Sequence, residues 1–195
     1  IPIACFAFAA LTKSAQLPFS RWLLGAMVAP TPSSALLHSA TMVKAGVYLL
    51  FRLSPALFGT MTGTMVSFIG GLTFLLASLL AISKSDAKAV LAYSTISNLG
   101  LIVACAGVGM SETIWAAIYL LIFHAVSKAM MFQDVGAVEN SLHSRNIENM
   151  QGLIYRLPRL AFIMLIGIAG MYLAPFGMLI AKWAAFKAFV DASNP

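Results

Sequence analysis

The side chains of this sequence that could do chemistry are lysines and histidines set within apolar stretches. Both residue types exchange protons with water, and desolvation favours the neutral form of each. A charge at the centre of a membrane-spanning helix costs at least about 2.5–3.5 kcal/mol, so a sequence that retains several indicates a function for them. These residue types predict a proton relay rather than the binding of a large substrate. The candidates are Lys13, His38, Lys44, His124, Lys128 and Lys182.

Spacing connects two of these candidates directly. His124 and Lys128 are four residues apart in HAVSK, so they share one face of a helix. His38 and Lys44 are six residues apart and do not share a face. The polar residues that could hold water between the candidates are Ser14, Gln16, Thr31, Ser33, Ser39, Thr41, Ser94, Thr95, Ser97 and Asn98.

Two prolines interrupt apolar stretches close to a lysine. Pro18 follows Lys13, and Pro175 precedes Lys182. A proline frees a backbone carbonyl, and within a bilayer that group must be satisfied by protein or by a water-filled cavity. We therefore expect a broken helix at each proline. We also expect Lys13 to be a buried proton site that water reaches through the break.

Structural roles remain open for several charged residues. A lysine near a helix end can extend its amine to the lipid headgroups, which applies most to Lys88 and Lys187. A histidine can serve only as a hydrogen-bonding group between helices. Asp134 is either interfacial or the partner of a basic residue, and the sequence leaves both interpretations open.

The composition requires a membrane environment. Of 195 residues, 61% are hydrophobic and 9% are charged, whereas soluble domains average about 45–50% and about 25%. A membrane-spanning helix needs about 20 mostly apolar residues. We predict an all-α integral membrane protein, a bundle of about six transmembrane helices with two of them broken by proline. The apolar stretches cover about 1–29, 33–51, 65–83, 89–109, 113–137 and 159–190.

The charges outside these stretches indicate the orientation. Alternation of the spans leaves Arg52 alone on one side, so the positive-inside bias places the other side in the cytoplasm. The net charge is +6, but the basic residues are dispersed, which does not favour nucleic-acid binding. The basic residues on the cytoplasmic side are Arg21, Lys84, Lys88, Arg145, Arg156 and Arg159.

Four motifs follow one another between residues 13 and 183: KSAQLPFSRWLLGAMVAPTPSSALLHSATMVKAGVYLL, DAKAVLAYSTISNLG, FHAVSKAMMF and APFGMLIAKW. In type and order they resemble the proton-translocating, antiporter-like subunits of respiratory complex I. The same family includes subunits of multisubunit sodium/proton antiporters and of membrane-bound hydrogenases. The resemblance implies an inverted-repeat, antiporter-like fold with two discontinuous helices. Residues 1–195 are then expected to be a fragment of a single proton-translocating domain that lacks N-terminal and C-terminal helices.

The resemblance implies roles on the intake side. Lys13 matches the central proton-binding lysine of the intake half-channel, and His38 matches the histidine of the next helix. Lys44 matches a position that is lysine in some paralogues and threonine in others. The glutamate paired with the Lys13 position belongs to an earlier family helix that this chain lacks.

The remaining candidates match the exit side of the family. His124 and Lys128 match the histidine and central lysine that bridge the two half-channels, and Lys182 matches the ionisable residue where protons leave. The chain departs from the family pattern elsewhere. Ala174 replaces the first residue of a frequent double proline, and Leu120 replaces a frequent second histidine. Gln133 and Asp134 enter a run that is usually small and apolar. These features are most similar to the large membrane subunit of energy-converting nickel–iron hydrogenases.

The resemblance implies a membrane subunit that translocates protons through buried Lys and His residues and water. The expected setting is a redox-driven complex, either an energy-converting hydrogenase or an NADH:quinone oxidoreductase-like assembly, in a prokaryotic cell membrane. No cofactor is expected in this chain, with Fe-S clusters, Ni-Fe centres or flavin only in partner subunits. The expected partners are other membrane subunits and a peripheral redox arm. The alternative is a sodium/proton antiporter subunit without a redox partner, and a plain membrane anchor would leave the buried lysines unexplained.

Overall fold

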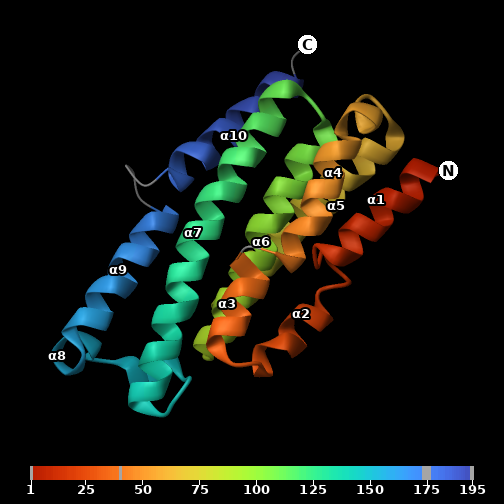
Figure 1. Ribbon diagram of the computed structural model, residues 1–195. Coiled ribbons are helices and arrows are strands. Elements are labelled where there is room, and N and C mark those ends of the chain that lie inside the picture. The colour runs from red at the N-terminus through yellow and green to blue at the C-terminus, as the bar shows by residue number, and fades with distance from the viewer. Residues whose placement is uncertain (1, 40, 173–176, 194–195) are drawn as a thin grey trace.

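The structure is a computed structural model that describes residues 2–39, 41–172 and 177–193. The predicted all-α architecture is confirmed, since helices make up nearly all of the described chain (Figure 1). The helices are α1 (Pro2–Lys13), α2 (Arg21–Gly25), η1 (Ala26–Val28), α3 (Thr31–Ser39), α4 (Met42–Leu57), α5 (Met61–Ile82), α6 (Ala87–Val108), α7 (Ser111–Leu142), η2 (Ile147–Met150), α8 (Leu153–Arg156), α9 (Pro158–Tyr172) and α10 (Met178–Ser193).

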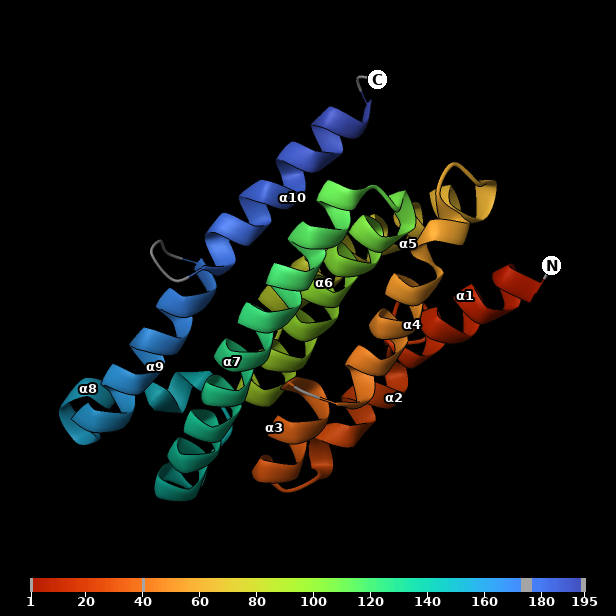
Figure 2. The ribbon, with the colours of Figure 1, turned by 45° about the horizontal axis from the view of Figure 1, so that its top comes forward.

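The long helices run side by side, with α6 at the centre of the bundle. Helix α6 packs against α5, α7 and α4, and most of its length is buried. Helices α9 and α10 lie along α7 on one flank, while α1 packs against α4 on the other (Figures 1 and 2). Among the described residues, four segments are long and apolar enough to cross a membrane: Thr31–Leu57, Met61–Ile82, Ala87–Val108 and Ser111–Leu142.

Three of the six apolar stretches contain more than one helix. In the first stretch, α1 ends at Lys13 and α2 begins at Arg21, and Pro18 lies in the turns between them. In the last stretch, α9 ends at Tyr172 and α10 begins at Met178, but Pro175 lies outside the described residues. The second stretch contains α3 and α4 as separate helices, which the sequence pattern does not predict.

Small residues allow α5 and α6 to approach closely. A Cβ atom added to Gly100 of α6 would lie 2.7 Å from the carbonyl oxygen of Gly70 on α5. Contact between small residues is a common means of packing helices in membranes, where dispersion replaces the hydrophobic effect as the driving force. This close approach fixes α6 in the bundle and thereby positions the polar side chains that α6 presents to α7.

One end of the bundle carries most of the charged connections. The turn before α6 joins the connection after α7 through two backbone hydrogen bonds, Ala87 N–H to Arg145 O at 3.0 Å and Ile147 N–H to Ser85 O at 2.9 Å. Lys88 lies at this end, but its side chain is only 2% exposed. Its charge is therefore held inside the protein instead of being free at the membrane surface.

Candidate functional site

Helix α7 carries one stripe of residues that reaches three other helices. Leu121, His124, Lys128 and Phe132 are spaced three or four residues apart, so they lie along one face of the helix. The side chains of His124, Lys128 and Phe132 are fully buried. The four-residue spacing of His124 and Lys128 therefore places both side chains on one buried face of α7, as the sequence predicts.

Lys128 is bound to α6 through its amine. Its Nζ donates a hydrogen bond to the carbonyl oxygen of Leu91 at 2.9 Å and another to the hydroxyl oxygen of Ser94. The same Leu91 oxygen also accepts from the hydroxyls of Ser94 and Thr95. A lysine held by a carbonyl and a hydroxyl, with neutral acceptors on both sides, can lose a proton without leaving a carboxylate unpaired.

Lys44 brings α4 to the same stripe. Its Nζ donates to the carbonyl oxygen of Leu121 on α7 at 3.1 Å, and the side chain is largely buried. Leu121 precedes His124 by three residues, which is close to one helical turn. Lys44 therefore contacts the stripe before His124, whereas Lys128 follows His124 in the stripe, and both lysines lie within electrostatic reach of the His124 ring.

Both candidate histidines are buried with ring nitrogens free to bind. Among the described residues, neither nitrogen of His124 nor of His38 has a hydrogen-bond partner. The His38 ring stacks on Phe132, with centroids 5.4 Å apart and an interplanar angle of 21°. Phe132 is four residues after Lys128, so α3 presents His38 one helical turn from the central lysine. A buried polar atom without a partner is costly and indicates a site for water or for proton exchange.

A cavity lies between Ser94, the hydroxyl partner of Lys128, and Lys182. It has a volume of about 550 Å³, and its lining includes Ser94 and Asn98 of α6, Tyr172 of α9 and Lys182 of α10. The Lys182 side chain is half-buried, and its Nζ lies 5.1 Å from the centroid of the Tyr172 ring. Ser94 therefore contacts the Lys128 amine and also lines the same cavity as Lys182.

The lining of this cavity is polar on its α6 side. Asn98 donates through Nδ2 to the carbonyl oxygen of Ser94 at 2.6 Å, and its Oδ1 is without a protein partner among the described residues. The hydroxyls of Ser97 and Ser78 lie 2.7 Å apart. A cavity of this size has room for several water molecules, and its polar residues, Ser78, Ser94, Ser97, Asn98, Tyr172 and Lys182, offer the two to four polar partners that each water needs.

Lys13 lies apart from the other candidates. It is the last residue of α1, and its side chain is exposed. The expected burial of Lys13 is therefore not observed in this chain, because α1 packs mainly against α4 and its outer side is uncovered. Helix α4 approaches this region closely, since a Cβ added to Gly46 would lie 3.2 Å from the Cβ of Lys13.

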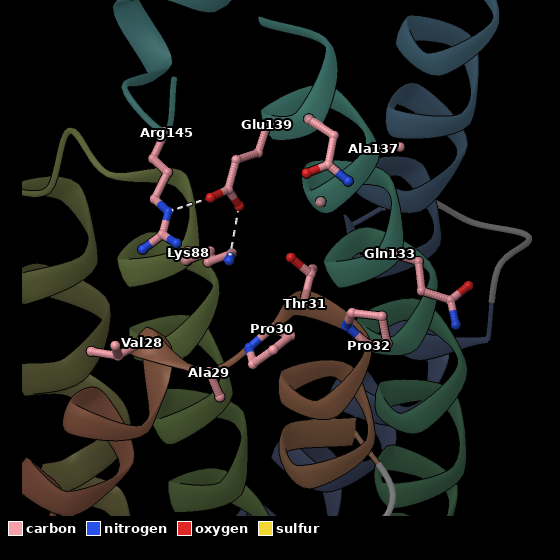
Figure 3. Close-up of a pocket in the computed structure, with 12 residues that line it drawn as sticks. Val28, Ala29, Pro30, Thr31, Pro32, Lys88, Gln133, Ala137, Glu139 and Arg145 are labelled. Carbon is pink, nitrogen blue, oxygen red and sulfur yellow. Dashed lines mark hydrogen bonds and ion pairs between the residues drawn. The ribbon is translucent and has the colours of Figure 1, made fainter. Parts of the chain in front are cut away.

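A second polar cluster, which the candidate set does not include, lies where α3, α6 and α7 meet at the charged end. Lys88 Nζ lies 2.8 Å from a carboxylate oxygen of Glu139, and Arg145 Nε binds the other oxygen (Figure 3). A pocket of about 530 Å³ opens beside this cluster, with Pro30 and Thr31 on its other side. The sequence does contain a signal for the pair, since Lys88 begins one span and Glu139 ends the next, which places opposite charges at one end of two antiparallel helices.

Comparison with known proteins identifies the family. The family described as NADH:quinone oxidoreductase/Mrp antiporter, TM matches residues 2–195. The chain belongs to this family. The match covers every helix described above, so the stripe on α7 and the cavity beside α6 are parts of a family member's membrane domain.

Relatives of known name and structure agree with this assignment. A Staphylococcus aureus protein named as antiporter subunit mnhA2 is 41% identical over 205 residues, which cover 97% of this chain and 25% of that protein. The Mrp complex from Dietzia sp. DQ12-45-1b matches with a TM-score of 0.90 and 42% identity, over 97% of this chain and 21% of that one. An archaeal membrane-bound sulfane sulfur reductase matches with a TM-score of 0.85 and 26% identity, over 99% of this chain and 41% of that one. The chain spans about a quarter of the length of the curated relatives it matches.

Proposed function

We propose that this chain is the proton-translocating part of a membrane antiporter subunit, with Lys128 as its central proton carrier. The observation that carries this proposal is the position of Lys128. Its amine is fully buried on α7, binds Ser94, and reaches through that residue the cavity that Lys182 also lines. A buried lysine beside a cavity with a polar wall can take up a proton on one side and release it on the other.

Repulsion between the neighbouring lysines would make proton uptake at one site alternate with proton release at the next. Lys44, Lys128 and Lys182 all lie within electrostatic reach of His124, and Lys182 lies within reach of Lys128. Like charges at short range in a poorly solvated region disfavour each other, so protonation at one site promotes release at the next. A proton arriving near Lys44 would pass through His124 to Lys128 and leave through the cavity at Lys182.

His38 would supply a second approach to Lys128. Its ring lies beside Phe132 and within electrostatic reach of the Lys128 amine. Lys13 enters this scheme as an intake site for protons. Because its side chain is exposed in this chain, that role requires a further helix against the outer side of α1.

The assembly we favour is an Mrp-type antiporter that exchanges sodium for protons. Two relatives support it, the Staphylococcus aureus antiporter subunit and the Mrp complex from Dietzia, both at 41–42% identity. The partners would then be other membrane subunits, and the proton path would be driven by a cation gradient. No redox cofactor would be needed in this chain or in its partners.

A redox-driven complex is the second candidate, supported by the match to the membrane-bound sulfane sulfur reductase. In that setting the chain would again carry protons, and Fe-S clusters, Ni-Fe centres or flavin would reside in a peripheral arm of partner subunits. A hydrogenase belongs to this class. The two candidates use the same residues of this chain and differ only in what drives them.

The test uses everted membrane vesicles that contain the full-length protein in its complex. Sodium is added without an electron donor, and the internal pH is followed with a fluorescent amine. We expect sodium-dependent proton movement in the wild type, its loss in Lys128→Ala, and normal movement in Lys187→Ala, whose side chain is exposed on α10. Proton movement only after addition of an electron donor would instead support the redox-driven complex. Normal proton movement in a correctly assembled Lys128→Ala complex would rule out the central role of Lys128.

A further inference from the structure

Asp134 is a buried carboxylate that the proton path above does not use. It lies on α7 and is only 4% exposed, and neither of its carboxylate oxygens has a hydrogen-bond partner among the described residues. Glu139, five residues later on the same helix, is bound by Lys88 and Arg145. Buried carboxylates are normally paired in this way, so Asp134 needs a different explanation.

The side of α7 that carries Asp134 faces α9. A Cβ added to Gly167 would lie 2.8 Å from Cγ of Met131, and one added to Gly170 would lie 3.2 Å from Oγ of Ser127. Ser127, Met131 and Asp134 are spaced four and three residues apart, so they form one stripe of α7. This stripe is separate from the one that carries His124 and Lys128.

The register of the two helices places Asp134 against an apolar turn of α9. Helices α7 and α9 run in opposite directions (Figure 1), so moving along α7 from Met131 to Asp134 moves backwards along α9 from Gly167. The residue reached is Met164, and its neighbours in Leu160–Gly167 are all apolar. Helix α9 therefore covers Asp134 without offering a donor side chain.

The charged groups on the surrounding elements are engaged elsewhere or directed outward. Lys128 donates to Leu91 and Ser94 on α6. Lys88 and Glu139 bind each other at the charged end. Arg159, at the start of α9, has an exposed side chain. An ionised Asp134 would thus be an isolated charge in an apolar contact, which is strongly disfavoured.

A bound metal cation is a poor candidate for neutralising the charge of Asp134. Hard cations take six or more oxygen ligands, whereas the described residues contain no group of three or more His, Cys, Asp or Glu side chains that could hold a metal ion. A proton needs only one carboxylate oxygen. Binding of a proton converts the carboxylate to a neutral carboxylic acid and requires no other reactant.

We propose that Asp134 is a proton-binding carboxyl between α7 and α9, distinct from the lysine and histidine stripe. Its carboxyl is neutral while α9 is packed against α7, because the contact excludes water. Release of the proton requires α9 to separate from α7 at Met164, so that water reaches the carboxylate. Protonation of Asp134 is thereby linked to the position of α9, the helix that precedes the Lys182-bearing α10.

Infrared spectroscopy of the full-length protein in membranes tests this proposal without measuring transport. A protonated carboxylic acid gives a carbonyl stretching band that is separate from the carboxylate and amide bands. We expect this band in the wild type at neutral pH and its loss in the difference spectrum of Asp134→Asn. Glu139→Gln is the matched control, since Glu139 is ion-paired on the same helix, and it should leave the band unchanged.

A second variant protects the test against misfolding of the first. Asp134→Glu should keep a carboxylic acid band and shift its position, which assigns the band to residue 134. Identical carboxylic acid bands in the wild type, Asp134→Asn and Asp134→Glu would overturn the proposal. The result is independent of the proposed transport path, because Lys128→Ala should abolish proton movement and still retain the Asp134 band.

Discussion

The amine of Lys128 on α7 donates a hydrogen bond to the carbonyl oxygen of Leu91 on α6, with Nζ and oxygen 2.9 Å apart. The same oxygen accepts from the hydroxyls of Ser94 and Thr95. A main-chain carbonyl group of α6 thus holds the amine of a fully buried lysine. Because this acceptor is neutral, the charge of Lys128 depends on its surroundings and can change.

Removal of the Ser94 hydroxyl should weaken this arrangement without destroying it. Ser94→Ala leaves the carbonyl oxygen of Leu91 as the remaining acceptor of the Lys128 amine among the described residues. A hydrogen bond to a charged group contributes about 1.5–3 kcal/mol, so proton movement in vesicles should fall by about tenfold or more. Ser83→Ala, in the exposed turn after α5, serves as the control and should behave as wild type. Equal rates in the Ser94 and Ser83 variants would show that Ser94 plays no part in proton transfer.

Replacement of His124 should slow transport strongly while the complex still assembles. Its ring is fully buried, lies within electrostatic reach of Lys44 and Lys128, and is free of hydrogen-bond partners among the described residues. A positioned acid–base group accelerates proton transfer by about 10²–10⁴-fold. His124→Gln should lower the rate by at least the smaller factor, as measured by sodium-driven proton movement. His143→Gln, in the connection after α7, should leave the rate unchanged, and a similar loss in both variants would argue against a specific role for His124.

Some of this arrangement could be predicted from the sequence, and the reason differs from residue to residue. The pairing of His124 and Lys128 on one face follows from their spacing alone. The acceptor at Leu91 could not be predicted, because every residue has a carbonyl and the sequence does not say which one a distant lysine meets. The exposed position of Lys13 depends on which helices cover α1, and no local pattern contains that information.

The sequence also does not show how differently Asp134 and Glu139 are surrounded. The two carboxylates are five residues apart on one helix, and the sequence alone gives them similar surroundings. Their environments differ because Glu139 meets α6 at Lys88, whereas Asp134 lies on the stripe of α7 that faces α9 at Ser127 and Met131. Of the two interpretations open from the sequence, a basic partner is not observed for Asp134 among the described residues, and an interfacial position stays a prediction.

Two glycines in a row on α5 provide a matched test of helix packing. A Cβ on Gly70 would lie 2.7 Å from the carbonyl oxygen of Gly100 on α6, whereas a Cβ on Gly71 would meet no atom within 4 Å. Overpacking of this kind typically costs about 1–3 kcal/mol, so Gly70→Ala should lower the free energy of unfolding. Gly71→Ala should be neutral or stabilising, because alanine favours a helix by about 0.5–1 kcal/mol over glycine. Thermal unfolding of the purified protein in detergent measures both, and equal melting temperatures would contradict the close α5–α6 contact.

Replacement of the residues in the ion-pair cluster at the charged end should lower stability in an order set by how deeply each charge is buried. Lys88 is 2% exposed and Glu139 is 18% exposed, whereas Arg145 is 43% exposed. Removing one partner of a buried pair strands a charge and costs about 3–5 kcal/mol, while an exposed pair contributes about 0–1 kcal/mol. Glu139→Ala should therefore destabilise the protein far more than Arg145→Ala in thermal unfolding. Adding Lys88→Met to Glu139→Ala removes the stranded charge and should recover much of the loss. A double variant that is less stable than Glu139→Ala alone would show that Lys88 stabilises the bundle through contacts other than this pair.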